Sequence, residues 1–211
     1  MTRRWRAGQV TKRGFDIVAA LTLLVVLSPA LALGAAAVRL SSPGSVLFRQ
    51  TRIGRHGRLF RIVKFRTMTV DAEELLSSDT SLHSRYVSLD FKLPLEDDPR
   101  VTRIGRTLRR TYLDELPQLW NVLVGEMSLV GPRPVLVSEL DRYGDWRWAY
   151  DRVRPGLTGA WQVGPLPREP YPARARIDAE YVASWSLVRD IGILTRTPHA
   201  VFRGFSAITR P

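Results

Sequence analysis

The sequence contains no cysteine and few histidines, and these shortages exclude several kinds of site at once. Without cysteine the chain cannot form disulfide bonds, bind a metal through thiolates or use a cysteine nucleophile. The three histidines, His56, His83 and His199, are too scattered to match the ligand spacing of a zinc site. Zinc and thiol chemistry are therefore not expected.

Acidic residues are also scarce relative to basic ones. Lysine and arginine number 32 against 20 aspartates and glutamates, which gives a formal net charge of +12. Such a surplus attracts polyanions: nucleic acid, anionic lipid headgroups or phosphorylated substrates. Most of the basic residues are arginine, whose planar guanidinium can grip a phosphate at two points. A GC-rich genome would also enrich arginine, so specific placements must identify the partner.

A charge-free run of 22 residues, 17–38, stands near the N-terminus. As a straight helix it would span roughly 33 Å, enough to cross the hydrocarbon core of a bilayer. Three interpretations compete: a cleaved signal peptide, since Ala30-Leu31-Ala32 resembles a cleavage site, a simple transmembrane helix, or a helix that breaks and returns to the same side. Pro29 motivates the third, because it deprives the Val25 carbonyl of its helical partner, and Ser28 can hydrogen-bond the freed backbone.

The charges around this run bear on its topology. Basic residues precede it, which favours a cytoplasmic N-terminal end, and the remainder of the chain is more basic still. Taken alone, the segment favours an ordinary transmembrane helix over the other two interpretations. A re-entrant helix would keep both ends on the cytoplasmic side.

The rest of the 211-residue chain is expected to form one compact α+β domain with more helix than strand. Two short apolar segments around a basic, glycine-containing turn predict a β-hairpin with strands at 45–50 and 59–65. The segments 131–134 and 155–159 are expected to be shaped, turn-rich loops. Helices are expected over 71–76, 102–110 (or a basic turn), 114–123, 139–153, 177–185 and 188–202, the last breaking near Pro198.

Two adjacent acids, Asp114 and Glu115, follow directly after five arginines between positions 100 and 110. Residues three apart in a helix drift by roughly 60° per step, so only some of these arginines can face one site. Asp114 has two interpretations. It can be a helix N-cap, or it can be an ionised carboxylate that acts as a nucleophile or a metal ligand, and the first does not exclude the second.

The residue types fit phosphoryl transfer. This chemistry needs a nucleophile, cations that neutralise phosphate oxygens and, often, Mg²⁺ held by a carboxylate. An aspartate can be the nucleophile and form an acyl-phosphate. The two acids supply the carboxylates, and the candidate cations are Lys64, Arg66, Arg109 and Arg133. The first two are equally explained as exposed strand residues, and the last as a loop residue that braces a carboxylate.

The chain resembles a known family, the bacterial sugar transferases that initiate surface-glycan assembly. These enzymes are also called monotopic polyprenyl-phosphate phosphoglycosyl transferases. The matching blocks run in family order and cover most of the chain. They are KRGFDIVAALTLLVVLSPALAL, PGSVLFRQTRIGRHGRLFRIVKFRTM, DAEELL, DDPRVTRIGRTLRRTYLDELPQLWNVLVGEMSLVGPRP, RPGLTGAWQV and RIDAEYVASWSLVRDIGIL.

The resemblance implies a re-entrant membrane helix broken at Ser28-Pro29. Residues 1–40 would form the basic N-terminus and this helix, and residues 41–211 a single catalytic domain on the cytoplasmic face of the bacterial inner membrane. With 16 residues before Ile17, the chain is similar to the minimal form of the family. Membrane lipids are thus expected partners, and nucleic acid is not; a homodimer is a further candidate assembly.

The resemblance also implies a mechanism. Asp114 would attack the sugar-bearing phosphate of a UDP-sugar, release the nucleoside monophosphate and pass the phosphosugar to polyprenyl (undecaprenyl) phosphate, the first membrane step of exopolysaccharide or glycoconjugate synthesis. Glu115 would assist by positioning Mg²⁺ or by helping proton transfer, and both acids are the expected metal ligands. Arg109 and Arg133 would bind phosphate or nucleotide, and the same pocket would be lined by Lys64 and Arg66.

Two features depart from the family pattern, and one alternative function stays open. The turn after Val163 reads Gly164-Pro165-Leu166-Pro167-Arg168 where many members have a Ser-Gly-Arg-like turn, and Tyr112 stands where a small serine is common. The sugar therefore cannot be named from the resemblance. The alternative is a non-enzymatic basic membrane module that binds anionic lipid or nucleic acid, which would not explain acids set among arginines.

Overall fold

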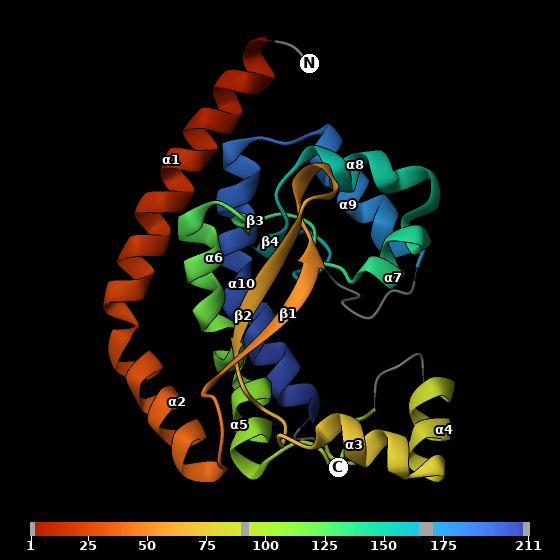
Figure 1. Ribbon diagram of the computed structural model, residues 1–211. Helices are drawn as coiled ribbons and strands as arrows, with labels where there is room; N and C mark the ends of the chain where they lie inside the picture. The colour runs from red at the N-terminus through yellow and green to blue at the C-terminus, as the bar shows by residue number, and fades with distance from the viewer. Residues whose placement is uncertain (1–2, 90–92, 165–170, 209–211) are drawn as a thin grey trace. The chain divides into compact units, whose positions relative to one another are not determined.

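The computed structural model describes residues 3–89, 93–164 and 171–208 (Figure 1). The chain is helix-rich, with 63% of it helical and only small sheets, so the predicted α+β class is confirmed in that respect. The helices are α1 (Arg3–Val26), α2 (Ser28–Ser41), α3 (Ala72–Ser78), α4 (Thr80–Ser88), α5 (Arg103–Thr111), α6 (Leu119–Val124), α7 (Val137–Leu140), α8 (Arg147–Arg152), α9 (Ala173–Ala183) and α10 (Leu187–Ile208). The strands are β1 (Leu47–Ile53), β2 (Leu59–Phe65), β3 (Ser128–Val130) and β4 (Gly156–Thr158). Short 3₁₀ helices occupy Arg55–Gly57, Leu113–Gln118 and Asp141–Trp146.

The chain forms two compact units. The larger unit comprises Met1–Ser28, Arg49–Val63 and Pro117–Pro211, and the smaller unit comprises Pro29–Phe48 and Lys64–Leu116. The predicted organisation, a membrane helix within residues 1–40 and one catalytic domain over 41–211, stays a prediction.

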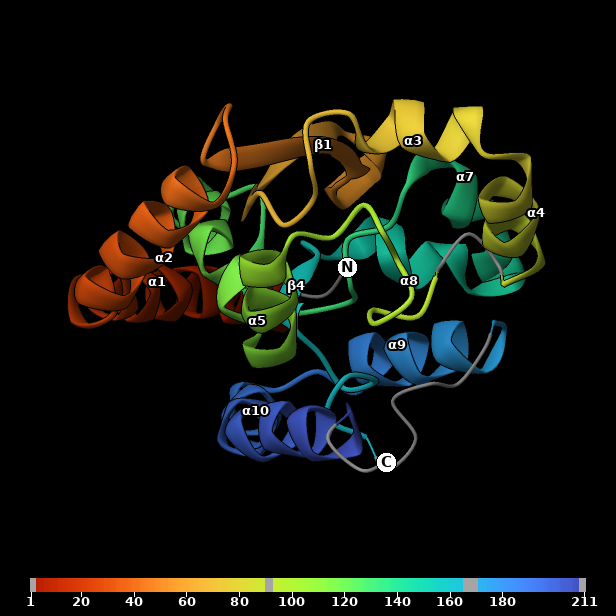
Figure 2. The same ribbon diagram turned by 90° about the horizontal axis from the view of Figure 1, so that it is seen from below.

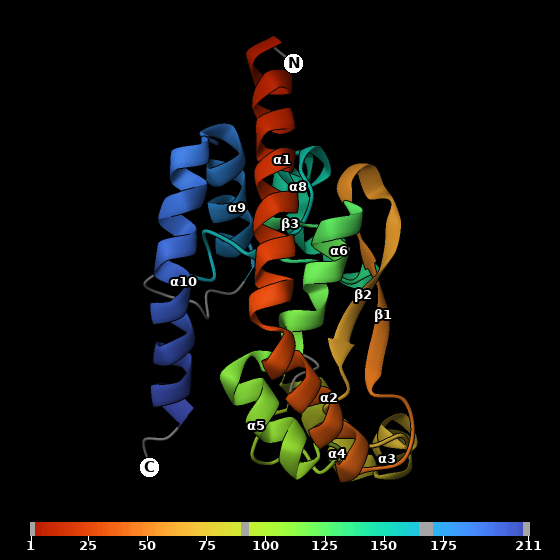
Figure 3. The same ribbon diagram turned by 90° about the vertical axis from the view of Figure 1, so that its left-hand side faces the viewer.

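The larger unit is built around α1, which packs against α6 and β3 (Figure 3). Apolar side chains such as Ala20, Leu119 and Val122 are fully buried in its core. Arg13 caps the end of α6 by donating to the carbonyls of Val122 and Leu123, at 2.6 and 2.7 Å. Carbonyls at the end of a helix lack internal partners, so a cation there is favourable.

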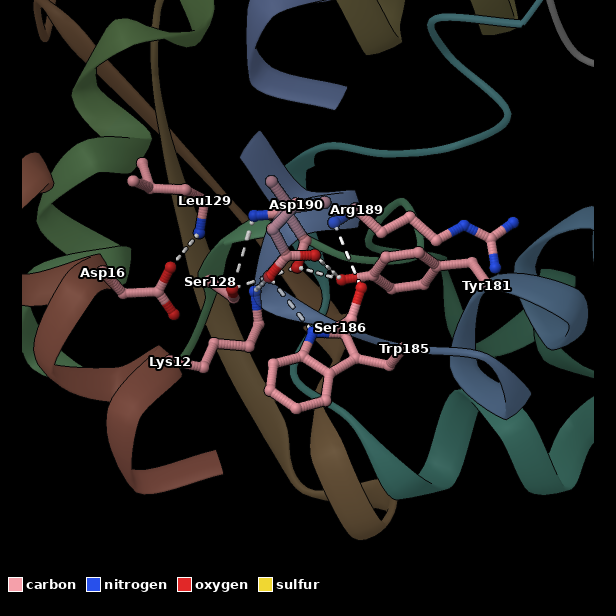
Figure 4. A network of polar contacts seen from close by, with 10 residues as sticks. Lys12, Asp16, Ser128, Leu129, Tyr181, Trp185, Ser186, Arg189 and Asp190 are labelled. Atoms are coloured by element: carbon pink, nitrogen blue, oxygen red, sulfur yellow. Dashed lines mark hydrogen bonds and ion pairs between the residues drawn. The ribbon is translucent and has the colours of Figure 1, made fainter. Parts of the chain in front are cut away.

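A buried polar network joins α1 to α10 within the larger unit (Figure 4). Lys12 donates to Asp190 at 2.5 Å, and the same carboxylate accepts from the Tyr181 hydroxyl at 2.6 Å and from the Trp185 indole at 3.1 Å. Asp190 is therefore buried with its charge fully paired, which is the condition under which a buried carboxylate is tolerated. On the same face of α1, Asp16 accepts from the backbone N–H of Leu129 at 3.1 Å.

The smaller unit has its own apolar core. Val38 of α2, Phe65 of β2 and Leu108 of α5 are buried together. Helices α3 and α4 follow one another and pack together (Figure 2). The unit also holds α5 close to the segment after β2, which is where the candidate site lies.

The hairpin prediction is confirmed, since β1 and β2 pair in a two-stranded sheet. The expected helix over 139–153 is wrong as a continuous element, because Gly144 takes φ 47° and ψ −128° and separates α7 from α8. The expected loop at 155–159 contains β4, which pairs in parallel with β3. Glycine permits this approach: a Cβ on Gly156 would lie 2.1 Å from the backbone nitrogen of Gly131.

Two helix predictions also need correction. Helix α10 continues past Pro198 instead of breaking there, since one lost backbone hydrogen bond need not end a long helix. The expected helix over 114–123 is a 3₁₀ helix followed by α6. Asp114 lies in the first turn of that 3₁₀ helix, and Gln118 is the N-cap of α6, so the capping interpretation of Asp114 is wrong.

The N-terminal helices have the length and composition of a membrane element only as a pair. Among the described residues no single helix is long and apolar enough to cross a bilayer, whereas Gly8–Val26 and Ser28–Ser41 together meet the criterion across a bend of 62°. At the break, the hydroxyl of Ser28 donates to the carbonyl of Val25 at 2.8 Å. The sequence predicted this bond, because Pro29 has no backbone N–H to donate to the Val25 carbonyl.

Candidate functional site

The candidate site lies in the smaller unit, where α5 is held tightly against the segment that follows β2. The Thr102 hydroxyl caps α5 by accepting from the Gly105 N–H at 2.9 Å. The Thr102 N–H in turn donates to the Thr67 carbonyl at 3.0 Å, and the Thr69 N–H donates to the Arg100 carbonyl at 2.9 Å. A Cβ on Gly105 would lie only 2.0 Å from the Thr67 carbonyl oxygen, so this contact requires glycine.

The end of α5 directs the chain into the two acids. Tyr112 adopts a left-handed conformation with φ 56° and closes the helix. The next residues enter the 3₁₀ helix, whose first turn carries Asp114 and Glu115. The sharp turn at Tyr112 therefore places both carboxylates directly after a helix that is fixed to residues 67–69.

Glu115 forms an ion pair with Lys64, the penultimate residue of β2. The Lys64 ammonium donates to Glu115 at 2.8 Å, and both side chains are largely buried. A charge-assisted hydrogen bond of this length fixes the position of the carboxylate. The predicted cation Lys64 is thus brought together with one of the predicted acids.

Asp114 is buried and only partly satisfied. It is 8% exposed, and its Oδ1 atom has no hydrogen-bond partner among the described residues. Burial raises the pKa of its carboxyl to about 6, and the neighbouring charge of Glu115 adds to this, while Lys64 and Arg109 oppose it. A buried carboxyl with a raised pKa and a free oxygen is costly for folding and is typical of a functional site.

Arg109 is oriented by a residue that the sequence did not single out. Its Nε donates to the Thr67 hydroxyl at 2.8 Å, and Thr67 is itself buried. Burial lowers the pKa of the Arg109 guanidinium, and the charges of Asp114 and Asp98 oppose this. Thr67 lies inside the KFRTM block, but only the folded contact with α5 reveals that its hydroxyl supports Arg109.

The two other predicted cations occupy different surroundings. Arg66 donates to the Ser42 carbonyl at 2.8 Å, to the Ser42 hydroxyl at 2.9 Å and to the Pro43 carbonyl at 2.5 Å, so it braces the turn after α2. Arg133 belongs to the larger unit, in the loop after β3. The substrate-binding roles of both arginines stay predictions.

The predicted magnesium ligands are two carboxylates rather than a larger cluster. Within residues 3–89, 93–164 and 171–208, no group of three or more histidine, cysteine, aspartate or glutamate side chains is arranged to hold a metal ion. Mg²⁺ commonly takes one or two protein carboxylates and completes its shell with water and substrate phosphates. The unpartnered Oδ1 of Asp114 beside Glu115 fits such a site.

The smaller unit therefore gathers two carboxylates, a lysine and an arginine. The chain belongs to the bacterial sugar transferase family, whose sequence model matches residues 7–204.

Its relatives include a UDP-galactose-lipid carrier transferase of Erwinia amylovora, which is 45% identical over 196 residues covering 91% of this chain. The exopolysaccharide production protein ExoY of Sinorhizobium fredii is 42% identical over 195 residues, 92% of this chain. A UDP-glucose:undecaprenyl-phosphate glucose-1-phosphate transferase of Caulobacter vibrioides is 42% identical over 200 residues, 90% of this chain. The chain spans 40%, 86% and 69% of the lengths of these three relatives, respectively.

Proposed function

We propose that this protein transfers a sugar phosphate from a UDP-sugar to polyprenyl phosphate, undecaprenyl phosphate in bacteria, and releases UMP. Family membership supports this, as do the names of relatives that carry out such transfers. The observation that carries the proposal is the buried carboxylate of Asp114, whose unpartnered oxygen stands next to the Lys64–Glu115 ion pair and within electrostatic reach of Arg109.

In this proposal Asp114 is the nucleophile. One of its carboxylate oxygens bonds to the phosphorus that carries the sugar, and the bond from that phosphorus to the bridging oxygen breaks, so the electron pair leaves with UMP. An oxygen of polyprenyl phosphate then attacks the same phosphorus and releases the carboxylate. The product is a polyprenyl diphosphate sugar.

The surrounding side chains have separate tasks. The Arg109 guanidinium, oriented by Thr67, neutralises phosphate oxygens while charge moves to the leaving group. Lys64 holds the Glu115 carboxylate in place beside the nucleophile. Mg²⁺, held by Asp114 and Glu115, would supply further neutralisation of the diphosphate.

A panel of UDP-sugars tests the function directly. Purified full-length protein in detergent, supplied with polyprenyl phosphate and Mg²⁺, is expected to release UMP from at least one of them, and the names of the relatives make UDP-galactose and UDP-glucose the first to try. Removing Mg²⁺ with EDTA is expected to stop the release, and adding it back to restore it. Absence of UMP release from every UDP-sugar, with salt-sensitive nucleic-acid binding instead, would favour the basic membrane module.

The pH dependence of UMP release should report the ionisation of Asp114. Because the attacking carboxylate must be ionised, the single-turnover rate is expected to fall about tenfold per unit below a pH of about 6 and to be flat above it. Lys64 lowers the pKa of Asp114 and Glu115 raises it. The acid limb should therefore move to higher pH in Lys64→Met and to lower pH in Glu115→Gln; shifts in the same direction would contradict this electrostatic assignment.

We propose further that α1 and α2 form a re-entrant membrane element on the cytoplasmic face of the membrane. The support is the bend of 62° between two apolar helices, the Ser28 bond that satisfies the Val25 carbonyl, and the exposed apolar side chains near the break. Those side chains are Val18, Leu21, Val25, Val26, Leu33 and Leu40. Apolar side chains that the protein leaves uncovered fit a lipid environment.

Cysteine labelling tests this topology cleanly because the native chain has no cysteine. Val10→Cys and Ser45→Cys introduce exposed thiols on either side of the charge-free run 17–38. In inside-out vesicles both are expected to react with an impermeant maleimide, and in intact spheroplasts neither should. If the Ser45→Cys thiol reacts in intact spheroplasts and the Val10→Cys thiol does not, the element crosses the bilayer.

A further inference from the structure

A buried arginine of the larger unit packs its guanidinium against two aromatic rings. Arg174, at the start of α9, is only 8% exposed. Its guanidinium carbon lies 4.3 Å from the centre of the Trp161 ring and 5.0 Å from the centre of the Tyr171 ring. Both rings therefore contact the cation through their faces.

The N–H groups of Arg174 are not used by the described part of the chain. Its Nε is buried without a hydrogen-bond partner, and no ion pair or hydrogen bond joins its guanidinium to a described residue. Asp178, one turn further along α9, is within electrostatic reach but accepts instead from the Tyr143 hydroxyl at 2.8 Å. An N–H donor that is buried without an acceptor, as the Nε of Arg174 is among the described residues, is expensive.

The aromatic contacts explain only part of this arrangement. Ring faces attract the positive charge, but they leave the N–H groups, which lie in the guanidinium plane, without acceptors. The same rings carry two more buried polar atoms without a hydrogen-bond partner among the described residues, Trp161 Nε1 and Tyr171 Oη. Gln162, the residue after Trp161, has a buried Oε1 that accepts no hydrogen bond from the described residues, and this atom can accept one from a ligand hydroxyl.

We propose that Arg174 binds a phosphate group, with Trp161 and Tyr171 holding the guanidinium in place and offering further donors. An anion with several oxygens suits a planar fork of N–H groups, and it gives the buried Nε an acceptor. The inference rests on the proposed function for the origin of the ligand. The phosphate belongs either to the nucleotide or to the polyprenyl phosphate acceptor.

Binding measurements on the full-length protein in detergent distinguish these sources. Titrations with UMP and with farnesyl phosphate, a short polyprenyl phosphate, are carried out on the native chain and on Arg174→Gln. The variant is expected to weaken the binding of one of them by about 10- to 100-fold, the range for losing a charged hydrogen bond. Weaker UMP binding assigns the site to the nucleotide, and weaker farnesyl phosphate binding assigns it to the acceptor.

The matched control is Arg152→Gln. Arg152 also lies over an aromatic ring, 4.8 Å from the centre of Trp148, but it is exposed. Its replacement removes an arginine–aromatic contact without touching the proposed site, so both dissociation constants should remain native. Arg174→Lys keeps the positive charge but lacks the planar guanidinium. It is expected to bind the same ligand less tightly than the native chain, and it provides the test if Arg174→Gln does not fold.

Several results would overturn the proposal. Native dissociation constants for both ligands in Arg174→Gln, accompanied by a lower melting temperature, would show that Arg174 only supports the fold. Absence of binding of either ligand to the native chain would also overturn it. These outcomes are independent of turnover: a native chain that binds phosphate through Arg174 but releases no UMP from any UDP-sugar would refute the proposed function and leave the site standing.

Discussion

Asp114→Asn is expected to lose UMP release down to background, by about 10⁴-fold or more, and at the same time to make the protein more stable at neutral pH. The loss follows because an amide cannot form the acyl-phosphate, and the remaining groups of the site cannot replace a nucleophile. The gain follows from the burial of the Asp114 carboxylate, which has an oxygen without a hydrogen-bond partner among the described residues. The Asp114 carboxylate is therefore expected to be required for activity and to lower the stability of the folded protein.

The sign and size of the stability change follow from the pKa. The folded chain holds the Asp114 pKa at about 6 instead of 3.8, so the folded state binds this proton more tightly than the unfolded state. Stability is therefore lost as pH rises from about 4 to about 6, and keeping the group ionised above that range costs about 3 kcal/mol. Asparagine avoids this cost, which corresponds to several degrees in melting temperature for a protein of this size.

Thermal unfolding at pH 4.5 and pH 8 measures this effect. The melting temperature of Asp114→Asn is expected to exceed that of the native chain at pH 8, and the difference should shrink at pH 4.5. Asp145→Asn is the control, because Asp145 is an exposed aspartate in the larger unit and its change should be small at both pH values. A melting temperature for Asp114→Asn below the native value at pH 8 would contradict the account.

Gly105→Ala is expected to cost both stability and activity, although it adds a single methyl group far along α5 from the acids. The new Cβ would lie 2.0 Å from the Thr67 carbonyl oxygen, and the next atoms it meets, at 2.7 and 2.8 Å, are also backbone. Backbone cannot rotate away as a side chain can, so α5 must move off residues 67–69. We expect a loss of about 2–4 kcal/mol of unfolding free energy.

The same displacement should disable the site. Arg109 lies on α5 and is oriented by the Thr67 hydroxyl, so separating the two removes the support for the cation. UMP release is expected to fall by about 10²-fold even at temperatures where the variant is folded. Gly192→Ala is the matched control: a Cβ added to this helical glycine would meet nothing within 4 Å, and alanine there should stabilise α10 slightly. Native stability and activity in Gly105→Ala would show that the contact with Thr67 is not needed.

Local patterns in the sequence predicted much of what surrounds the site. Two short apolar segments around a glycine-containing turn predicted the β1–β2 hairpin, and the missing N–H of Pro29 predicted the bond from Ser28 to the Val25 carbonyl. Both depend on neighbouring residues only. The acids and Lys64 were identified by residue type and by the resemblance, and the structure brings Lys64 and Glu115 into contact.

Features that depend on contacts between distant parts of the chain could not be predicted from the sequence. The split of the predicted 139–153 helix depends on the conformation of Gly144, and β4 forms because its glycine meets the one after β3. The contact of Thr67 with Arg109 and that of Arg174 with Trp161 join residues that are remote in the chain. No periodicity or spacing in the sequence records such contacts.

The measurement that tests the central claim most directly is intact-protein and peptide mass spectrometry after incubation with the active UDP-sugar and Mg²⁺ in the absence of polyprenyl phosphate. The account predicts a mass increase of one sugar phosphate on the peptide that carries Asp114, its absence in Asp114→Asn, and its loss when polyprenyl phosphate is added. UMP release that occurs only when polyprenyl phosphate is present, with no adduct on the protein, would contradict the account and indicate direct transfer between the two substrates.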